Sequence, residues 1–170
     1  YIETGSLISI KKNVKDILIL SEEEVIKMNP MDFEEFLWAM GNDTLMDFIK
    51  KCFKTKKELG QALHRKAMDY FKEYLIVGGM PQAVLEYRKT RDFEKTDKIK
   101  RNILRLYRED IRKHADELNL KVEQIFDMIP SQLQKHEKKF NISNLDENAR
   151  YRNFEGAFYW LTDACLVNIA

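Results

Sequence analysis

Four arginines on one expected helix are the residues whose spacing suggests a chemical role. Arg101, Arg105, Arg108 and Arg112 recur at steps of four, three and four, so they form one stripe on a helix expected over residues 92–115. Guanidinium groups match phosphate geometry, and the stripe could bind an anionic partner such as DNA. The charged outer face of an amphipathic helix is the more ordinary explanation of the same pattern.

A second basic group lies between residues 50 and 57. Five of these eight residues are lysines. Such a group could neutralise phosphates, in which case binding would weaken steeply with added salt. The alternative is a solvated helix end, where lysines interact favourably with the negative end of the helix dipole.

The last fifty residues are typical of a winged helix. An apolar helix near 121–136 is followed by a turn at Arg150–Tyr151, a helix near 152–163 and the strand-like Leu166–Val167. In a DNA-binding version, Arg150 and Arg152 would contact phosphates or base edges. Winged helices also serve as packing or protein-contact modules, and Glu155 would repel phosphates, so this alternative stays open.

No residue pattern in the chain indicates catalysis. The sequence contains no G-x-x-x-x-G-K-[ST] phosphate loop, no G-x-G-x-x-G, no G-x-S-x-G and no H-E-x-x-H. His64, His114 and His136 lie far apart and lack partners at ligand spacing, so no metal site is expected. The two cysteines are too few for a disulfide framework or a cysteine zinc site.

Composition favours a helical protein. The 170 residues include only 6 glycines and 3 prolines, and 29 Lys and Arg balance 28 Asp and Glu. Few helix breakers and many Lys, Glu, Leu and Ile residues predict a mainly α fold. No apolar run approaches the ~20 residues that span a bilayer. We therefore expect no membrane partner, and the low cysteine count favours a reducing, cytoplasmic location.

The expected elements follow from apolar periodicity and from capping residues. Asp32 and Glu35 predict a capping box at the start of the first helix. Pro130 is expected to interrupt or kink the helix near 121–136. Strands are expected at Tyr1–Ile2, at residues 25–28 and from Leu166 to the end. The expected helices cover residues 32–41, 43–54, 59–77, 81–89, 92–115, 121–136 and 152–163, with a short segment at 143–149.

Five segments in a fixed order carry a family resemblance. They are Glu3–Leu7 (ETGSL), Asn29–Leu37 (NPMDFEEFL), Tyr74–Pro81 (YLIVGGMP), Ile103–Ile111 (ILRLYREDI) and Ile129–Leu133 (IPSQL). Together they resemble the bacterial and archaeal AAA-superfamily ATPases in which a P-loop core is followed by a domain of unknown function. The resemblance covers essentially the whole chain.

The resemblance implies a division of the chain into three regions. Residues 1–41 would be the end of an α/β ATPase core, residues 42–116 a helical lid-like region, and residues 117–170 the winged-helix-like start of the accessory domain. The phosphate loop and the acidic Mg²⁺-binding strand would precede Tyr1. ATP and Mg²⁺ would then be cofactors of the parent protein, and this chain alone would not hydrolyse ATP.

The resemblance also implies a role for the opening residues. The hydroxyl of Thr4 or Ser6 would occupy a sensor-like position beside the γ-phosphate and help to place the attacking water. The alternative is a plain strand-to-loop turn at Gly5. Three functions thus remain open: part of an AAA-type ATPase, a nucleic-acid-binding winged helix, or a scaffold for another protein or for self-association.

Overall fold

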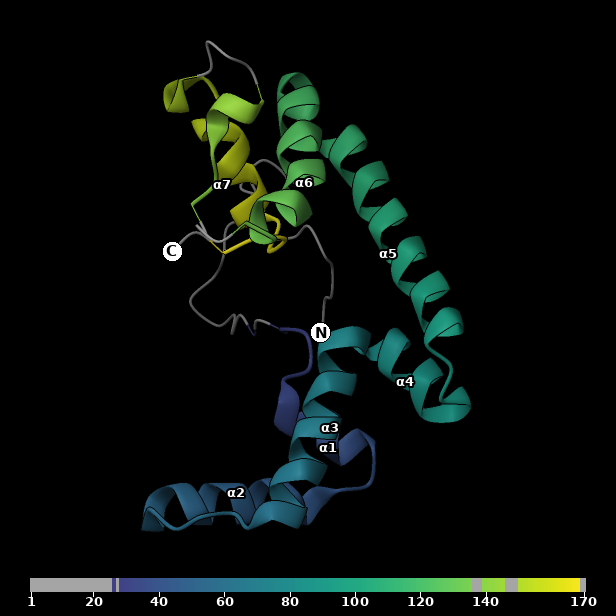
Figure 1. Ribbon diagram of the computed structural model, residues 1–170. Helices are drawn as coiled ribbons and strands as arrows, with labels where there is room; N and C mark the ends of the chain where they lie inside the picture. Colours follow the sequence, from purple (N-terminus) through teal and green to yellow (C-terminus); the bar gives the residue numbers. More distant parts are fainter. Residues whose placement is uncertain (1–25, 27, 136–138, 146–149, 169–170) are drawn as a thin grey trace, which may run out of the picture. The chain divides into compact units, whose positions relative to one another are not determined.

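The computed structural model describes residues 26, 28–135, 139–145 and 150–168, and these residues lie in helices, turns and irregular segments (Figure 1). The prediction of a mainly α fold is confirmed. The chain divides into two compact units, one formed by residues 25–105 and one that includes residues 106–170. The boundary falls within helix α5 (Phe93–His114). Among the described residues, no helix is long and apolar enough to cross a membrane.

The 25–105 unit is built from short helices with well-defined ends. It contains α1 (Phe33–Ala39), α2 (Asp43–Thr55), α3 (Gln61–Val77), α4 (Pro81–Thr90) and the first part of α5. The predicted capping box is confirmed: the Asp32 carboxylate accepts the Glu35 N–H and the Glu35 carboxylate accepts the Asp32 N–H, both at 2.9 Å. The predicted helix starts and stops in this unit agree with the structure to within about two residues.

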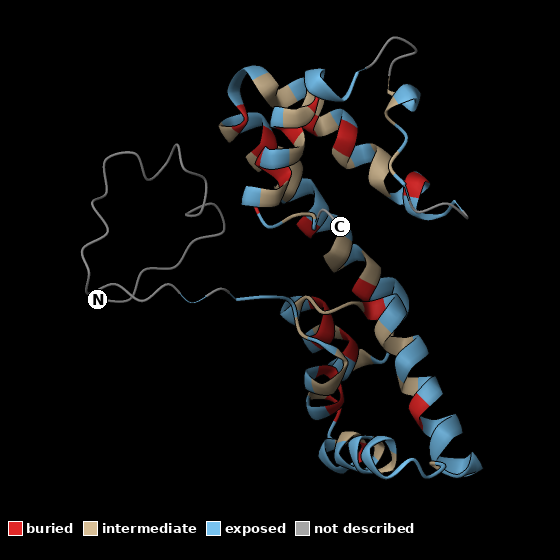
Figure 2. Cartoon of the chain, turned by 90° about the vertical axis from the view of Figure 1, so that its left-hand side faces the viewer, coloured by how far each residue is buried: buried red, intermediate tan, exposed pale blue. Residues whose placement is uncertain are grey.

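Helix α1 is the centre of this unit although it has only seven residues. Phe36 and Leu37 are both fully buried. Consecutive helical residues point about 100° apart, so the two side chains enter different cores. Leu37 packs with Leu45 of α2 and Ala67 of α3. Phe36 packs with residues of α3 and α4: Val77, Ala83, Val84 and Tyr87. Buried and exposed residues therefore alternate along each helix, as amphipathic packing requires (Figure 2).

The turn between α3 and α4 depends on two glycines with different roles. Gly78 ends α3 with φ of +80°, a backbone conformation that glycine adopts without strain. Gly79 lets the backbone of Met31 approach closely: the Met31 N–H donates to the Gly79 carbonyl at 2.8 Å, and a Cβ at Gly79 would overlap the Met31 carbonyl oxygen. Pro81 then occupies the first turn of α4, where its missing N–H costs nothing.

The 106–170 unit has its own core. Its described elements are the end of α5, a 3₁₀ turn at Asp116–Leu118, α6 (Asn119–Leu133), 3₁₀ turns at Ile142–Asn144 and Tyr151–Asn153, and α7 (Glu155–Asp163). Ile111, Val122, Ile125, Ala157 and Leu161 are almost fully buried at the contact of the three helices. Gln132, buried on α6, fixes the following segment by pairing with the backbone N–H and C=O of Asn141 at 3.3 and 3.4 Å.

Pro130 does not interrupt α6, which continues to Leu133. The prediction of an interruption is therefore wrong, and the alternative of a kink at Pro130 stays a prediction.

The strand predicted from Leu166 onward is absent through Asn168, and that prediction is also wrong there. The chain instead forms the C-terminal cap of α7. The Leu166 N–H donates to the Leu161 carbonyl at 3.0 Å, and the Cys165 N–H donates to the Thr162 carbonyl at 2.9 Å. With Cys165 at φ of +57°, these bonds form a Schellman cap. The cap occupies N–H groups that a wing strand would need for pairing.

Near residues 25–28, Ile26 and Met28 lie in irregular structure rather than in the predicted strand. The strand predicted at Tyr1–Ile2 and residues 146–149 of the predicted short segment lie outside the described residues. The winged-helix assignment and the three-region division stay predictions.

We expect Gly79→Ala to lower the free energy of unfolding by about 3 kcal/mol, because the new methyl group must displace the Met31 backbone. Gly156→Ala is the matched control: this glycine lies within α7, and an added Cβ would be at an ordinary contact distance from Leu118. The control should be neutral or up to about 1 kcal/mol more stable. Urea unfolding followed by circular dichroism measures both. Equal midpoints for Gly79→Ala and the wild type would contradict the close approach.

Candidate functional site

The predicted arginine stripe is present on α5, and most of it is engaged by carboxylates. Arg101 donates to Asp97 on the same helix at 2.6 Å. Arg108 donates from Nε and Nη2 to one oxygen of Asp127, at 3.0 and 2.8 Å. Arg112 donates to Glu123 at 2.6 Å. The last two bonds join α5 to α6 within the 106–170 unit.

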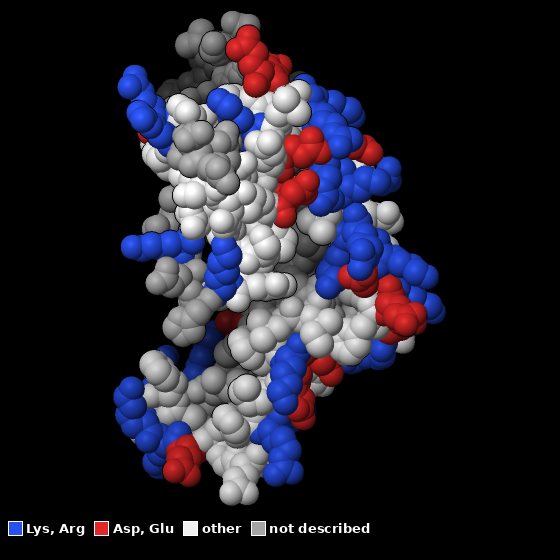
Figure 3. Space-filling view, turned by 45° about the horizontal axis from the view of Figure 1, so that its top comes forward, with Lys and Arg blue, Asp and Glu red and all other residues white. Residues whose placement is uncertain are grey.

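These ion pairs change what the stripe can do. The hydrogen bond from Arg112 to Glu123 raises the pKa of Arg112. The hydrogen bond from Arg101 lowers the pKa of Asp97. A phosphate at any of these arginines would share the guanidinium with a carboxylate that already offsets its charge. On the face shown in Figure 3, acidic side chains are accordingly interspersed with basic ones. The geometry favours a structural role for Arg108 and Arg112.

Arg150 and Arg152, by contrast, are exposed and form no ion pair with a described residue. They flank the start of the 3₁₀ turn that precedes α7. Lys121 of α6 lies near the same turn, where its ammonium donates to the Asn153 carbonyl at 2.8 Å. Of the predicted nucleic-acid contacts, these two arginines are therefore available to a ligand. The sensor-like Thr4 and Ser6 lie outside the described residues.

Two of the five family-like segments meet in the 25–105 unit. Besides the Met31–Gly79 backbone bond, the Tyr74 hydroxyl donates to the Met31 carbonyl at 3.0 Å. The Tyr74 ring also packs against Phe33 and Phe36, with centroids 5.7 and 5.4 Å away. Burial raises the pKa of Tyr74, and the nearby carboxylates of the capping box add to this effect. The tyrosine is thus held as a neutral donor.

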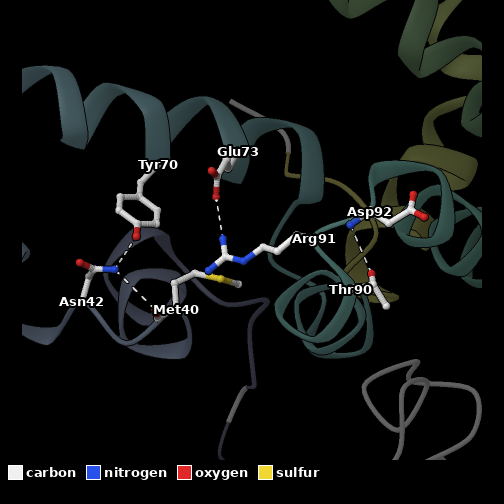
Figure 4. Close-up of polar contacts among 7 residues, drawn as sticks. All are labelled: Met40, Asn42, Tyr70, Glu73, Thr90, Arg91 and Asp92. Atoms are coloured by element: carbon white, nitrogen blue, oxygen red, sulfur yellow. Dashed lines mark hydrogen bonds and ion pairs between the residues drawn. The ribbon is translucent and has the colours of Figure 1, made fainter.

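A polar layer formed by Asn42, Tyr70, Glu73 and Arg91 lies in the same unit (Figure 4). The Asn42 amide donates to the Tyr70 hydroxyl at 2.7 Å, which links the α1–α2 turn to α3. Arg91, just after α4, donates to Glu73 of α3 at 3.3 Å and lies over the ring of Tyr87. Burial raises the pKa of Tyr87, and the charge of Glu73 acts in the same direction. The Asn42–Tyr70 bond thus links the α1–α2 turn to α3, and the Arg91–Glu73 bond links the end of α4 to α3.

The described part of the chain contains a shallow depression beside α3 and no group of metal ligands. This depression near the polar layer is lined by one face of α3, from Ala62 to Glu73, and one helix face cannot enclose a substrate. Within the described ranges, no three His, Cys, Asp or Glu side chains lie close enough to hold a metal ion. The polar contacts therefore position helices rather than reacting groups.

The sequence did not single out the two acidic residues that pair with Arg108 and Arg112. Asp127 and Glu123 are 19 and 11 positions from their arginines, so no local motif connects them. One signal was present: the two acids and the two arginines are each four residues apart, which places each pair on one helix face.

The 106–170 unit and the end of the 25–105 unit match a known family. Residues 68–170 match the sequence model of a family described as a domain of unknown function, DUF8612. The match covers more than half of the chain. The chain belongs to the DUF8612 family. The family region begins within α3 and includes the Tyr74–Pro81 segment, all of α5 and the arginine pairs to α6. No curated protein and no solved structure matches the chain.

The Tyr74–Met31 bond predicts a pH-dependent contribution to stability. Tyr74→Phe should lower the free energy of unfolding by about 1 kcal/mol near pH 7, because one partly buried hydrogen bond is lost. A raised pKa means that the folded state holds the phenol proton more tightly. The contribution is therefore complete below the unfolded pKa of about 10 and is lost as the pH rises through the higher folded pKa.

Chemical denaturation at a series of pH values measures the difference between wild type and Tyr74→Phe, which should shrink above pH ~10. Tyr159→Phe removes a hydroxyl from a side chain that is 56% exposed. This control should stay within about 0.5 kcal/mol of the wild type. A constant difference across the alkaline range would contradict the assignment.

Proposed function

We propose that this chain is part of an AAA-type ATPase: the end of the nucleotide-binding core, the helical lid-like region and the start of the accessory domain. ATP and Mg²⁺ bind the parent protein, whose location is the cytoplasm. The 170 residues themselves contain no phosphate loop, so neither the backbone cradle for the phosphates nor its lysine is supplied by this chain.

One observation carries the proposal beyond the sequence resemblance. Asn29–Leu37 and Tyr74–Pro81 are separate in sequence, yet they touch through the Met31–Gly79 backbone bond and the Tyr74–Met31 hydrogen bond. Both segments also contribute side chains to one buried core, in which Phe36 packs with Val77. If the two segments form one packing unit in the ATPases that they resemble, this contact is the one expected, and it supports the proposal.

The packing also suits a lid-like part. In AAA-type chemistry, the protein positions the phosphates and the attacking water, and a moving helical region can complete or open that site. In the 25–105 unit, α2, α3 and α4 are all fastened to the seven-residue α1. These contacts join α1, at the end of the proposed core, to α2, α3 and α4 of the proposed lid-like region, so a displacement of α1 would be passed to all three helices.

A second candidate function rests on Arg150 and Arg152. Both are exposed and unpaired with described residues beside the start of α7, where a winged-helix protein would contact DNA. This candidate does not exclude the first, because an accessory domain can bind DNA while the core hydrolyses ATP.

The ATPase proposal predicts that the 170-residue chain alone neither hydrolyses ATP nor binds Mg²⁺-ATP more tightly than about millimolar, because the phosphate cradle lies elsewhere. Calorimetric titration and a phosphate-release assay measure the two quantities. Micromolar binding would contradict this division of labour. The complete reading frame should also encode G-x-x-x-x-G-K-[ST] ahead of the codon for Tyr1. An initiator Met within a few codons of Tyr1 would overturn the proposal.

The DNA-binding candidate predicts that the chain binds duplex DNA with an affinity that falls as salt rises. Arg150→Gln/Arg152→Gln should weaken binding and reduce the slope of log affinity against log salt by about 1.8, because two phosphate contacts are lost. Arg88→Gln/Lys89→Gln removes two exposed cations at the end of α4 and serves as the control. Fluorescence anisotropy at several salt concentrations measures the slopes. Equal slopes for both double variants would exclude these arginines.

A further inference from the structure

The end of α2 combines an exposed aromatic ring with unpaired positive charge. The Phe53 side chain is 74% exposed, whereas the next most exposed aromatic side chain among the described residues, Tyr159, is 56% exposed. Lys50 is paired with Glu34 of α1 at 2.6 Å. The remaining lysines of the group form no ion pair with a described residue. We call Phe53 and these four lysines the α2 tip: Lys51, Lys54, Lys56 and Lys57.

The exposure of Phe53 follows from how α2 packs. The core-facing side of α2 passes from Leu45, which is 5% exposed, through the half-buried Ile49 to Phe53. The spacing of four residues keeps these side chains on one face. The helix extends beyond the neighbours that cover Leu45, so the last member of its apolar stripe meets solvent. An apolar side chain here contributes nothing to the core of the described unit.

The tip is held in a defined conformation. Lys56 adopts the left-handed conformation with φ of +53°, its N–H donates to the Phe53 carbonyl at 3.3 Å, and the Lys57 N–H donates to Cys52 at 3.1 Å. These bonds form a Schellman cap. The Lys56 ammonium consequently lies 4.5 Å from the centre of the Phe53 ring. The ring and the charges are presented together before any partner binds.

We propose that the α2 tip docks on the surface of an anionic phospholipid bilayer, with Phe53 inserted among the headgroups and the lysines against lipid phosphates and carboxylates. An apolar wedge surrounded by lysines is the composition of interfacial membrane contacts. Lysine stems bury along apolar surface while their ammonium groups stay in water. Four cations near an anionic leaflet supply the long-range attraction. This proposal departs from the expectation of no membrane partner, which rested on the lack of a membrane-spanning apolar run, because a contact at the bilayer surface needs no such run.

Nucleic acid fits the same surface less well. Proteins that bind single strands stack successive bases on several aromatic rings, whereas the tip offers one ring already covered on one face by Lys56. Arginine forks are the preferred phosphate contacts in nucleic-acid recognition, and the tip has none. The Thr55 hydroxyl donates to the Lys51 carbonyl within the helix and so does not face a base.

Cosedimentation with vesicles tests the proposal. The chain should sediment with vesicles containing about 30% phosphatidylserine and should not sediment with phosphatidylcholine alone. Phe53→Ser should reduce the partition coefficient about tenfold, and Lys54→Gln/Lys57→Gln should reduce it by a similar factor. Binding of the wild type should weaken as the salt concentration rises.

Matched controls separate the tip from general surface effects. Leu85→Ser changes an apolar side chain that is 49% exposed on α4, and Lys95→Gln/Lys98→Gln removes two exposed lysines of α5. Both should change the partition less than about twofold. Circular dichroism confirms that each variant is folded. In addition, the Phe53→Trp variant should show a blue-shifted emission with anionic vesicles, after subtraction of the wild-type signal from Trp38 and Trp160.

Three outcomes would overturn the proposal. The first is no sedimentation with anionic vesicles, and the second is sedimentation that Phe53→Ser and Lys54→Gln/Lys57→Gln leave unchanged. The third is tight binding of a single-stranded oligothymidylate that these variants abolish and that anionic vesicles do not compete for, which would assign the tip to nucleic acid. None of these outcomes depends on ATP binding, so the ATPase proposal stands or falls separately.

Discussion

The backbone contact between Met31 and Gly79 is the constraint on which the 25–105 unit depends. It fixes where the chain enters α1, and α1 in turn supplies Phe36 to the core shared with α3 and α4 and Leu37 to the core shared with α2. A side chain at position 79 would push Met31 outward and move both core residues together. The Tyr74 hydroxyl strengthens the contact from the side. Gly79 thus permits the backbone contact that precedes α1, the helix on which α2, α3 and α4 pack.

The sequence predicts the features that local physics decides. The capping box at Asp32 and Glu35, the proline in the first turn of α4 and the apolar stripes of the longer helices all involve residues within about four positions of each other. The end of α7 was mispredicted for a related reason. Apolar residues after Thr162 favour a strand, but Cys165 adopts the left-handed conformation that usually marks a glycine. The segment contains no glycine after Thr162, so its composition does not predict the cap.

The candidate site shows a different limit. Periodicity placed the arginines on one face of α5, but whether that face binds a ligand depends on what lies opposite. Asp127 and Glu123 come from α6, and the choice between a ligand-binding stripe and an interhelical contact is made by packing. Gln132 is a similar case, because its amide pairs with the backbone of Asn141, nine residues later, and no local pattern indicates that contact. Long-range partners are set by the fold and not by the neighbouring sequence.

The number of positive charges in a segment is therefore a poor guide to binding, and their pairing is a better one. Lys50 and Lys51 are adjacent in sequence, yet Lys50 is held by Glu34 while Lys51 meets no described carboxylate. A paired cation has a carboxylate that already offsets its charge, so a new anion gains less from it than from an unpaired cation, although breaking an exposed pair costs only about 0–1 kcal/mol. An unpaired lysine on a capped helix end loses only water and side-chain freedom. The α2 tip and the turn before α7 meet this condition, whereas Arg108 and Arg112 on α5 do not.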